Sequence, residues 1–222
     1  MLRSAVRLAL VCLCVTVLGS FSSDFGGIAV DRAYAQAQDV KPAELTREAI
    51  LNDPEAPVAG NPKGDVTIVA FFDYNCPYCK KAEPALQKLV KDDGHIRLVY
   101  KDWPILAPTS VYGAEVALAA KYQGKYQVVH DVLMRIPGTR VSKATMDKAL
   151  HDSGVDIPQL NKDLAAHLGA IQALLRRNNA QAEGLGLQGT PVYLIGPYKV
   201  AAALDYDGFK QAVAQARAKE GK

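Results

Sequence analysis

The sequence predicts an α/β domain whose sheet-forming segments are separated by a block of helices. Residues 66–72 form an apolar, β-branched run, which is followed by a helical pattern and a second strand-like run. A helical period then continues from residue 109 to residue 183, after which short strand-like runs return. Of the 222 residues, 49% are hydrophobic and 22% are charged, which excludes disordered, collagen-like and multipass membrane proteins.

Residues 1–35 are predicted to be a secretory signal peptide. Arg3 and Arg7 precede an apolar run at residues 8–18, and small and polar residues lead from this run to Ala33-Tyr34-Ala35, which fits a signal-peptidase site. The apolar run is much shorter than the ~20 residues that a membrane-spanning helix needs. We therefore expect the leader to be cleaved and the protein to be exported to the periplasm.

Residues 36–63 are expected to form an N-terminal arm or linker. A short helical stretch at residues 43–51 is followed by an approach rich in proline and glycine. The main domain, predicted to cover residues 64–222, opens with residues 66–72. Their continuous apolar character predicts a strand that is buried on both faces.

The two cysteines of the predicted domain follow this strand. Asp73-Tyr74-Asn75-Cys76-Pro77-Tyr78-Cys79 leads into a helical pattern over residues 80–91, which places Cys76 at the start of a helix. Pro77 suits the first helical position, whereas Pro84 is expected to kink the helix. A second strand at residues 95–101 completes a strand-helix-strand unit, for which a right-handed parallel crossover is predicted.

Four helices are predicted as an insertion over about residues 104–185. Their ranges are 111–123, 126–135, 143–152 and 158–183. Thr109 or Ser110 is expected to cap the first of these helices, and Ser142 the third. The chain then continues as a hairpin of strands at 191–195 and 198–202 and ends with an amphipathic helix at 205–218.

Cysteine usage indicates redox chemistry. Cys12 and Cys14 lie in the predicted leader, so the exported chain keeps only Cys76 and Cys79. A disulfide across two intervening residues constrains little chain, which makes this pair a poor structural staple. The amide N–H groups and the dipole of a helix start favour a thiolate at Cys76, and Cys79 lies one turn later. A substrate thiolate can attack the Cys76–Cys79 disulfide, and Cys79 or a second substrate thiol can resolve the mixed disulfide.

Metal and nucleic-acid sites are disfavoured by the same sequence. A zinc site would need two further ligands, and His95, His130, His151 and His167 show no paired metal-ligand spacing near the cysteines. We therefore predict no metal site. The formal net charge of +3, without clustered lysine and arginine, argues against nucleic acid as a partner.

The residues around the cysteines resemble a known family. Residues 71–80, Phe-Phe-Asp-Tyr-Asn-Cys-Pro-Tyr-Cys-Lys, with Thr190-Pro191 opening a later strand, are similar to the DsbA-like thiol:disulfide interchange proteins of the thioredoxin superfamily. The resemblance runs from about Gly64 to the C-terminus. It is strongest to the subgroup that includes copper-sensitivity suppressor protein C. This resemblance implies an α/β thioredoxin fold with an inserted helical domain.

The resemblance also implies roles for individual residues. Cys76 is expected to be the nucleophile and Cys79 the resolving thiol, and their redox-active disulfide is expected to be the only cofactor. Pro191 is expected to follow a cis peptide bond after Thr190, so that the loop offers a backbone edge to an extended substrate. Thr190, Pro191 and Tyr78 are the expected substrate-binding residues.

The expected partners also follow from the resemblance. They are cysteine-containing unfolded or misfolded exported proteins and a membrane redox partner of the DsbB or DsbD kind. Trp103 fits either a family feature or a core aromatic at a strand end. Asp73 fits either tuning of proton transfer at the buried thiol or a polar strand end.

One pair of residues departs from the family pattern. DsbA proteins have Pro-His between the cysteines, whereas this chain has Pro77-Tyr78, a pair typical of glutaredoxins. Because Tyr78 carries no positive charge, only Lys80 and Lys81 lie near the thiol in sequence. We therefore expect an oxidant of intermediate strength or an isomerase. The reduction potential and the redox partner determine the direction of electron flow.

Two alternative functions stay open at this point. Pro77-Tyr78 is compatible with a glutaredoxin-like reductase, although a small glutaredoxin has no room for the helical block between Cys76 and Pro191. A periplasmic copper-binding protein or chaperone is the other alternative, because two thiolates can hold Cu(I). Turnover on a scrambled substrate, compared with metal affinity, separates these functions.

Overall fold

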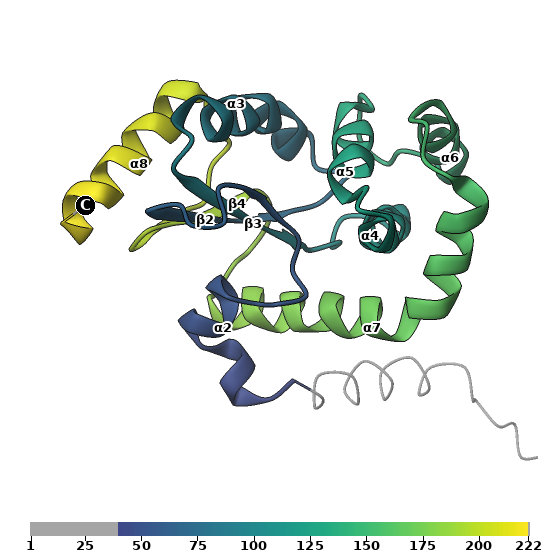
Figure 1. The fold of residues 1–222 in the computed structure, drawn as a ribbon, viewed down its shortest axis with the longest axis horizontal. Coiled ribbons are helices and arrows are strands. Elements are labelled where there is room, and N and C mark those ends of the chain that lie inside the picture. The colour runs from purple at the N-terminus through teal and green to yellow at the C-terminus, as the bar shows by residue number, and fades with distance from the viewer. Residues whose placement is uncertain (1–39, 222) are drawn as a thin grey trace, which may run out of the picture. The chain divides into compact units, whose positions relative to one another are not determined.

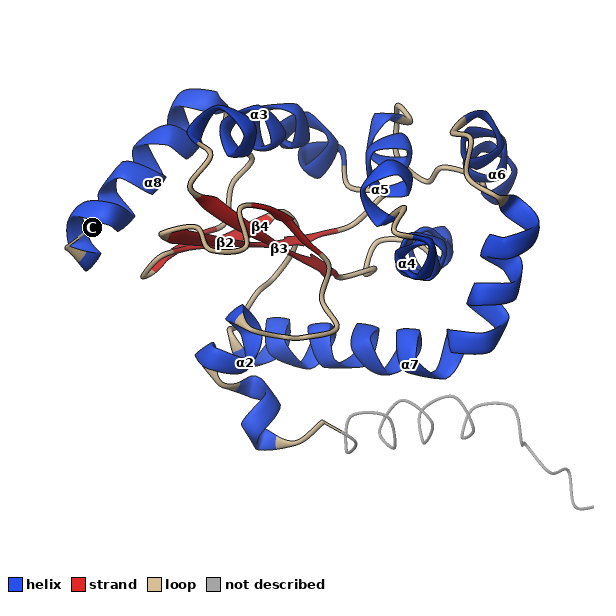
Figure 2. Ribbon diagram, viewed as in Figure 1, coloured by secondary structure: helices blue, strands red, loops and turns tan. Residues whose placement is uncertain are grey.

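The computed structural model describes residues 40–221, so the predicted signal peptide lies outside the described residues. Five strands form one sheet in the order β1-β3-β2-β4-β5 (Figures 1 and 2). The strands are β1 (Val58–Gly60), β2 (Val66–Phe72), β3 (Ile96–Asp102), β4 (Val192–Ile195) and β5 (Tyr198–Val200). Only β2 and β3 run parallel to each other, and the other neighbouring strands are antiparallel. The predicted α/β class is confirmed.

Strand β2 lies in the middle of the sheet because it can bury both of its faces. Alternate side chains, including Ile68 and Phe72, pack into one apolar cluster, and Val69 and Phe71 pack into a second cluster on the other face. Helices α3 (Pro77–Asp93) and α8 (Tyr206–Glu220) cover one face of the sheet, while α2 (Arg47–Leu51) and α7 (Ile157–Gly184) cover the other (Figure 1). The sheet is therefore a buried central layer.

Helix α3 is the crossover between the parallel strands β2 and β3. It begins immediately after Cys76, with Pro77 at its first position, where proline loses no hydrogen bond. Pro84 lies inside the helix, and Gly94, with a φ of 70°, ends it. This end requires a left-handed backbone conformation, which glycine adopts without a steric penalty.

The helical block between β3 and β4 contains α4 (Pro108–Ala120), α5 (Tyr126–Arg135), α6 (Lys143–Asp152) and α7. The bounds of α5 and α6 are those predicted from the sequence, and Ser142 caps α6 by accepting a hydrogen bond from the Thr145 N–H at 3.1 Å. The predicted cap of α4 is wrong. This helix begins three residues earlier than expected, after Ala107, and Ser110 lies inside it with its hydroxyl bonded elsewhere.

The described part of the expected arm, residues 40–63, packs against the sheet domain. It forms the short helices η1 (Pro42–Leu45) and α2, and then β1, which pairs antiparallel with β3. Ile50 is 2% exposed, and the buried carboxylate of Asp53 pairs with Lys101 of β3 at 2.8 Å and with Arg177 of α7. This segment is thus held to the domain by an apolar contact, strand pairing and buried charges.

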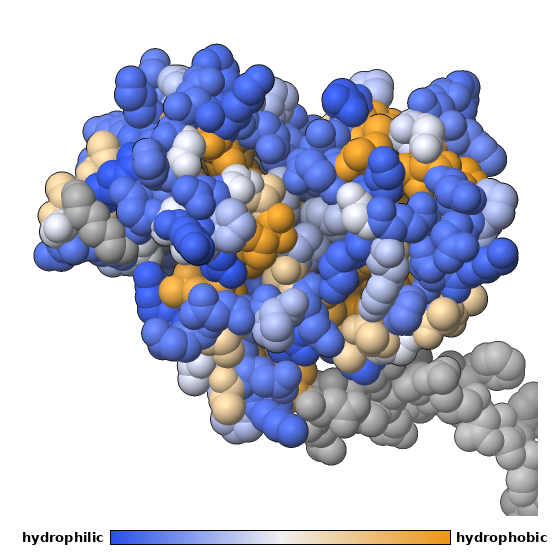
Figure 3. Space-filling model, in the orientation of Figure 1, coloured by the Kyte–Doolittle hydropathy of each residue, from blue (hydrophilic) through white to orange (hydrophobic). Residues whose placement is uncertain are grey.

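The surface of the described residues is largely hydrophilic on the side drawn in Figure 3, with apolar side chains reaching the surface near α3 and α5. Within residues 40–221, no helix combines the length and the apolar character needed to cross a bilayer.

Candidate active site

Cys76 lies at the point where β2 passes into α3. It is the residue that precedes the first turn of α3, and the backbone N–H of Cys79 donates a hydrogen bond to its Sγ atom at 3.3 Å. Both cysteines are free thiols and only 2% of each residue is exposed. The structure therefore places the two sulfur atoms one helical turn apart at a helix start, as the spacing predicted.

The two thiols have opposite acidities. A hydrogen bond from the Cys79 thiol, with help from the backbone N–H groups of Tyr78 and Cys79, lowers the pKa of Cys76 to about 6, although burial acts to raise it. Burial, reinforced by the neighbouring Cys76, raises the pKa of Cys79 far above that of a free thiol. At neutral pH, Cys76 is therefore the thiolate of the pair.

Lys80 is a cation close to this pair. Burial lowers the pKa of Lys80, while attraction to Asp73, Cys76 and Cys79 acts in the opposite direction, so its ammonium lies within electrostatic reach of both sulfur atoms. Its Nζ atom also donates a hydrogen bond to the Gly138 carbonyl at 2.9 Å. The sequence singled out Lys80 as a nearby positive charge, and in the structure its ammonium group is held by the Gly138 carbonyl.

Thr190 and Pro191 lie beside Cys76, although they are more than 100 residues later in the chain. The peptide bond between them is cis, and Cys76 Sγ lies 3.2 Å from the Thr190 carbonyl oxygen, to which the protonated thiol donates a hydrogen bond. This contact arises because β4, which starts at Val192, pairs antiparallel with β2, which ends just before Cys76. Residues 114 positions apart therefore meet at the sulfur.

Tyr78 and the Thr190-Pro191 loop line a common groove. Its volume is about 500 Å³, and its walls include residues 186–192 and 201–203. Tyr78 is 64% exposed, which is a large exposed fraction for an aromatic side chain. The five residues singled out from the sequence, Cys76, Cys79, Tyr78, Thr190 and Pro191, thus surround one sulfur atom and one groove.

Asp73 anchors the turn before Cys76. It is 1% exposed, and its Oδ2 atom accepts hydrogen bonds from the N–H groups of Ile105 and Leu106 at 2.8 and 2.9 Å. Its Oδ1 atom accepts hydrogen bonds from the Asn75 N–H and the Ser110 hydroxyl, both at 2.7 Å. These four hydrogen bonds fix the segment after β3 against the active-site turn.

Asn75 is a site residue that the sequence analysis missed. Its Nδ2 atom donates to the hydroxyls of Thr109 and Ser110 at 3.2 and 2.9 Å, and its Oδ1 atom accepts from the Val141 N–H at 2.6 Å. Asn75 is 2% exposed. Its position directly before Cys76 is the only sequence signal, because the partners lie 34 to 66 residues away.

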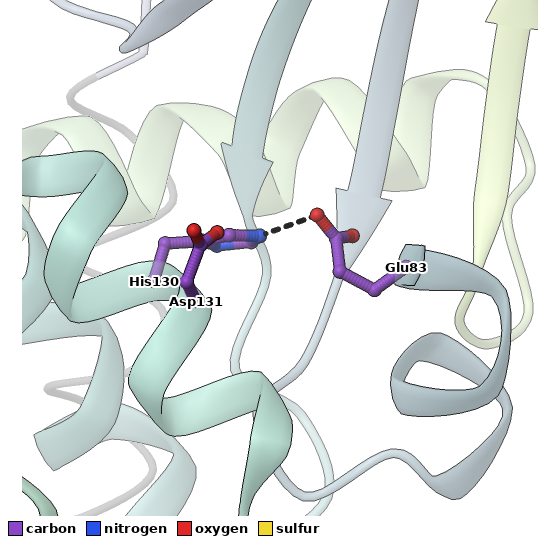
Figure 4. A group of neighbouring side chains, drawn as sticks. All are labelled: Glu83, His130 and Asp131. Carbon is purple, nitrogen blue, oxygen red and sulfur yellow. Dashed lines mark hydrogen bonds and ion pairs between the residues drawn. The ribbon is translucent and has the colours of Figure 1, made fainter. Parts of the chain in front are cut away.

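A polar cluster joins α3 to α5 (Figure 4). His130 is fully buried, and its Nε2 atom pairs with Glu83 Oε1 at 3.0 Å while its Nδ1 atom lies 3.1 Å from the Tyr74 hydroxyl. Although burial raises the pKa of Glu83, attraction to His130 lowers it below its usual value. The sequence analysis gave His130 no partner, because Glu83 is 47 residues away.

Glu83 and His130, together with the neighbouring Asp131, are the one group of three possible metal ligands within residues 40–221. The ligand atoms of Glu83, His130 and Asp131 lie within 4.8 Å of one another (Figure 4). Asp131 also accepts a hydrogen bond from Gln127 at 2.7 Å, and Glu83 accepts one from Gln87. The hydrogen bonds from Gln87 and Gln127 and the contact between Glu83 and His130 are enough to explain why the three side chains lie together.

The side chains of Trp103 and His167 make packing contacts outside the cysteine site. Trp103 is 4% exposed, its Nε1 atom donates to Asn179 Oδ1 at 2.9 Å, and its ring meets Phe71 edge to face, so it is a core aromatic. The His167 ring stacks on Tyr122 with centroids 3.6 Å apart. Neither side chain is bonded to the cysteines.

Comparison with solved structures places this geometry among thioredoxin-like proteins. A thioredoxin-like oxidoreductase from Silicibacter pomeroyi DSS-3 is 40% identical, with a TM-score of 0.73 over 78% of this chain and 98% of that one. The catalytic domain of Proteus mirabilis ScsC is 26% identical, with a TM-score of 0.69 over 79% of this chain and 96% of that one. The fold predicted from the motif is thereby confirmed.

Among curated proteins, the probable disulfide bond formation protein D of Bacillus anthracis is 25% identical over 69% of this chain and 75% of its own length. The Na(+)/H(+) antiporter NhaA 1 of Salinispora arenicola (strain CNS-205) is 28% identical over 79% of this chain. The chain spans only about a quarter, 26%, of that antiporter's length.

The family model described as thioredoxin matches residues 52–215. This match covers well over half of the chain and includes Cys76, Cys79 and Pro191. It also begins inside the segment that the sequence analysis expected to be an arm, which agrees with the packing of β1 on the sheet. The chain belongs to the thioredoxin family, and it carries a helical block between β3 and β4.

Proposed function

We propose that this protein is an exported protein-disulfide oxidoreductase that uses Cys76 and Cys79 to form, reduce or isomerise disulfide bonds. The observation that carries the proposal is the pairing of a thiol with a pKa of about 6 and a buried thiol with a raised pKa at one helix start. Such a pair has one sulfur that attacks and one that stays protonated until it is needed.

In the oxidising direction, the reaction starts from the Cys76–Cys79 disulfide. A substrate thiolate attacks Cys76 Sγ, the bond between the two cysteines breaks, and Cys79 leaves as a thiolate that takes up a proton. A second substrate thiolate then attacks the substrate sulfur of the mixed disulfide. Cys76 leaves as a stabilised thiolate, so the substrate loses two electrons and the dithiol form described above is produced. The same steps in reverse reduce a substrate disulfide.

The substrate would lie in the groove beside Tyr78, Thr190 and Pro191. The Thr190 carbonyl is already 3.2 Å from Cys76 Sγ, so a backbone that pairs with this loop brings its cysteine to the nucleophile. The exposed ring of Tyr78 offers apolar contact area at the same point. Cysteine-containing unfolded or misfolded exported proteins fit this open groove.

The compartment and the redox partner belong to the same proposal. Export to the periplasm rests on the leader pattern in residues 1–35, and recycling of the pair needs a membrane partner of the DsbB or DsbD kind. The redox-active disulfide is the only cofactor in this scheme. With Tyr78 in place of a histidine, we expect a potential between those of strong oxidants and reductants.

Two variants of the purified protein test the proposal. Cys76→Ser is expected to abolish refolding of a scrambled disulfide substrate, whereas Cys79→Ser is expected to accumulate mixed disulfides that are visible on non-reducing gels. Gln211→Ala, an exposed change on α8, is the control. Residual exchange by Cys76→Ser would contradict the assignment. An inactive dithiol that binds Cu(I) tightly would favour the copper-binding alternative instead.

A further inference from the structure

A second groove borders the active site on another face of α3. It has a volume of about 540 Å³ and lies between α3 and the segment that follows α5. Pro77, Lys80, Lys81 and Pro84 line it from α3, and this spacing of three, four and seven residues defines one helix face. Because Pro77 directly follows Cys76, the groove begins beside the nucleophile.

The other wall of this groove, residues 134–138, is hydrogen-bonded to the active-site segment through Gly138 and the nearby Val141. Lys80 Nζ donates to the Gly138 carbonyl at 2.9 Å, and Asn75 Oδ1 accepts from the Val141 N–H at 2.6 Å. Between these contacts Arg140 has a φ of 53°, a left-handed conformation that is uncommon for a residue with a side chain. The wall is therefore held in a fixed position relative to Cys76.

The lining combines apolar and cationic groups. Met134 and Ile136, which are 4% and 8% exposed, contribute the apolar part together with neighbouring prolines. Lys80, Lys81 and Arg135 provide three positive charges.

The two carboxylates that also line the groove are already engaged by other groups. Glu83 pairs with His130 and Gln87, and Asp131 accepts from Gln127, as part of the cluster in Figure 4. Because the lining holds three cations, Lys80, Lys81 and Arg135, against these two carboxylates, its net formal charge is positive.

We propose that this groove docks a segment of the substrate polypeptide that carries apolar and acidic side chains near its reactive cysteine. The proposal rests on the disulfide-exchange function and names the substrate feature that the site selects. A chain held here by its apolar side chain and by charge attraction to Lys81 and Arg135 approaches Cys76 along the face of α3 that starts at Pro77. The substrate then contacts both sides of the α3 start.

A pair of charged peptides tests this selection. Each peptide has one cysteine, activated as a mixed disulfide with thionitrobenzoate, and carries either Leu-Glu-Glu or Leu-Lys-Lys near that cysteine. The Cys76 thiolate attacks the peptide sulfur, the peptide–thionitrobenzoate bond breaks, and the coloured thionitrobenzoate anion leaves. The readout is the ratio of the two second-order rate constants for one protein, because any general change in Cys76 reactivity cancels in that ratio.

The native chain is expected to favour the acidic peptide by about threefold to tenfold at low salt, and less at high salt. Arg135→Glu and Lys81→Glu should each lower the ratio toward one, and the double variant should invert it. Lys162→Glu, an equal charge change on the exposed face of α7, is the matched control and should leave the ratio unchanged.

The outcomes separate this proposal from the proposed function. If both peptides react equally fast with the native chain, or if Lys162→Glu lowers the ratio as much as Arg135→Glu does, the groove does not select acidic segments. If neither peptide reacts and a small activated disulfide also fails to react, the disulfide-exchange function itself is wrong.

Discussion

The side-chain oxygen of Asn75 accepts a hydrogen bond from the backbone N–H of Val141 at 2.6 Å. This bond joins the residue before the nucleophile to the segment that leads into α6, 66 positions later in the chain. Two further bonds from Asn75 reach Thr109 and Ser110 at the start of α4. The position of Cys76 is thus tied to the helical block as well as to the sheet.

Asn75→Ala is expected to destabilise the protein by about 2–4 kcal/mol, because it leaves the buried Val141 N–H without an acceptor and removes a donor from the Ser110 hydroxyl. It should also raise the pKa of Cys76 by loosening the turn. Chemical unfolding of the reduced protein and the ultraviolet absorbance of its thiolate as a function of pH measure the two effects. Gln211→Ala is the surface control. A variant with native stability and a native thiol titration would show that Asn75 does not position Cys76.

The reactivity of Cys76 is expected to depend on pH with a midpoint near 6. Its pKa of about 6 means that alkylation of the reduced protein by iodoacetamide should rise through that pH and level off near neutrality. Cys79→Ala removes the largest cause of the lowered pKa, so its midpoint should move upward. Cys79→Ser keeps a hydroxyl donor and should move less. Equal midpoints for the two variants would contradict the role given to the Cys79 thiol.

The same shift has a consequence for the stability of the reduced protein. The folded pKa of Cys76 lies below that of an unfolded cysteine, which is about 8.5. The contribution of the thiolate is therefore complete above the unfolded pKa and is lost as pH falls through about 6. We expect the reduced form to lose stability relative to the Cys76→Ser variant when the pH is lowered from 8.5 to 6, as measured by urea unfolding.

Asp53→Asn is expected to cost about 3–5 kcal/mol, because it leaves the fully buried ammonium of Lys101 without its counter-charge. Lys101→Met, which removes the buried cation, should cost less than Asp53→Asn. Thermal unfolding measures both changes. The control is Asp152→Asn, which disrupts an exposed pair with Lys148 and should change stability by less than about 0.5 kcal/mol. Equal effects of Asp53→Asn and Asp152→Asn would show that the buried pair is unimportant.

The buried pair of Asp53 and Lys101 also predicts a loss of stability in acid. Although burial raises the pKa of Asp53, its hydrogen bonds with Arg177 and Lys101 and the attraction of Lys101 lower it to about 2. The stabilisation is therefore complete above the usual aspartate pKa of about 4 and disappears as pH falls through about 2. Unfolding of the native chain should become steeply pH-dependent in that window, and the dependence should be weaker in Asp53→Asn.

Local patterns predicted several elements correctly. The apolar run of β2, the helices α5 and α6 and the cap at Ser142 match the structure, because strand burial, helical period and capping are properties of neighbouring residues. The placement of Cys76 before the first turn of α3 has the same origin. Ser110 shows the limit of such patterns, since its hydroxyl is used by Asp73, 37 residues earlier, rather than by its own helix.

The sequence by itself determined the dithiol, its place at a helix start and the family. Only the tertiary structure showed that Asp73 and Asn75 anchor the turn, that Glu83 pairs with His130, and that residues 40–63 pack on the sheet. The reason is physical: these contacts join atoms of segments that are distant along the chain, and they form only when β2, α3 and the helical block are docked. A helical or strand period carries no information about such partners.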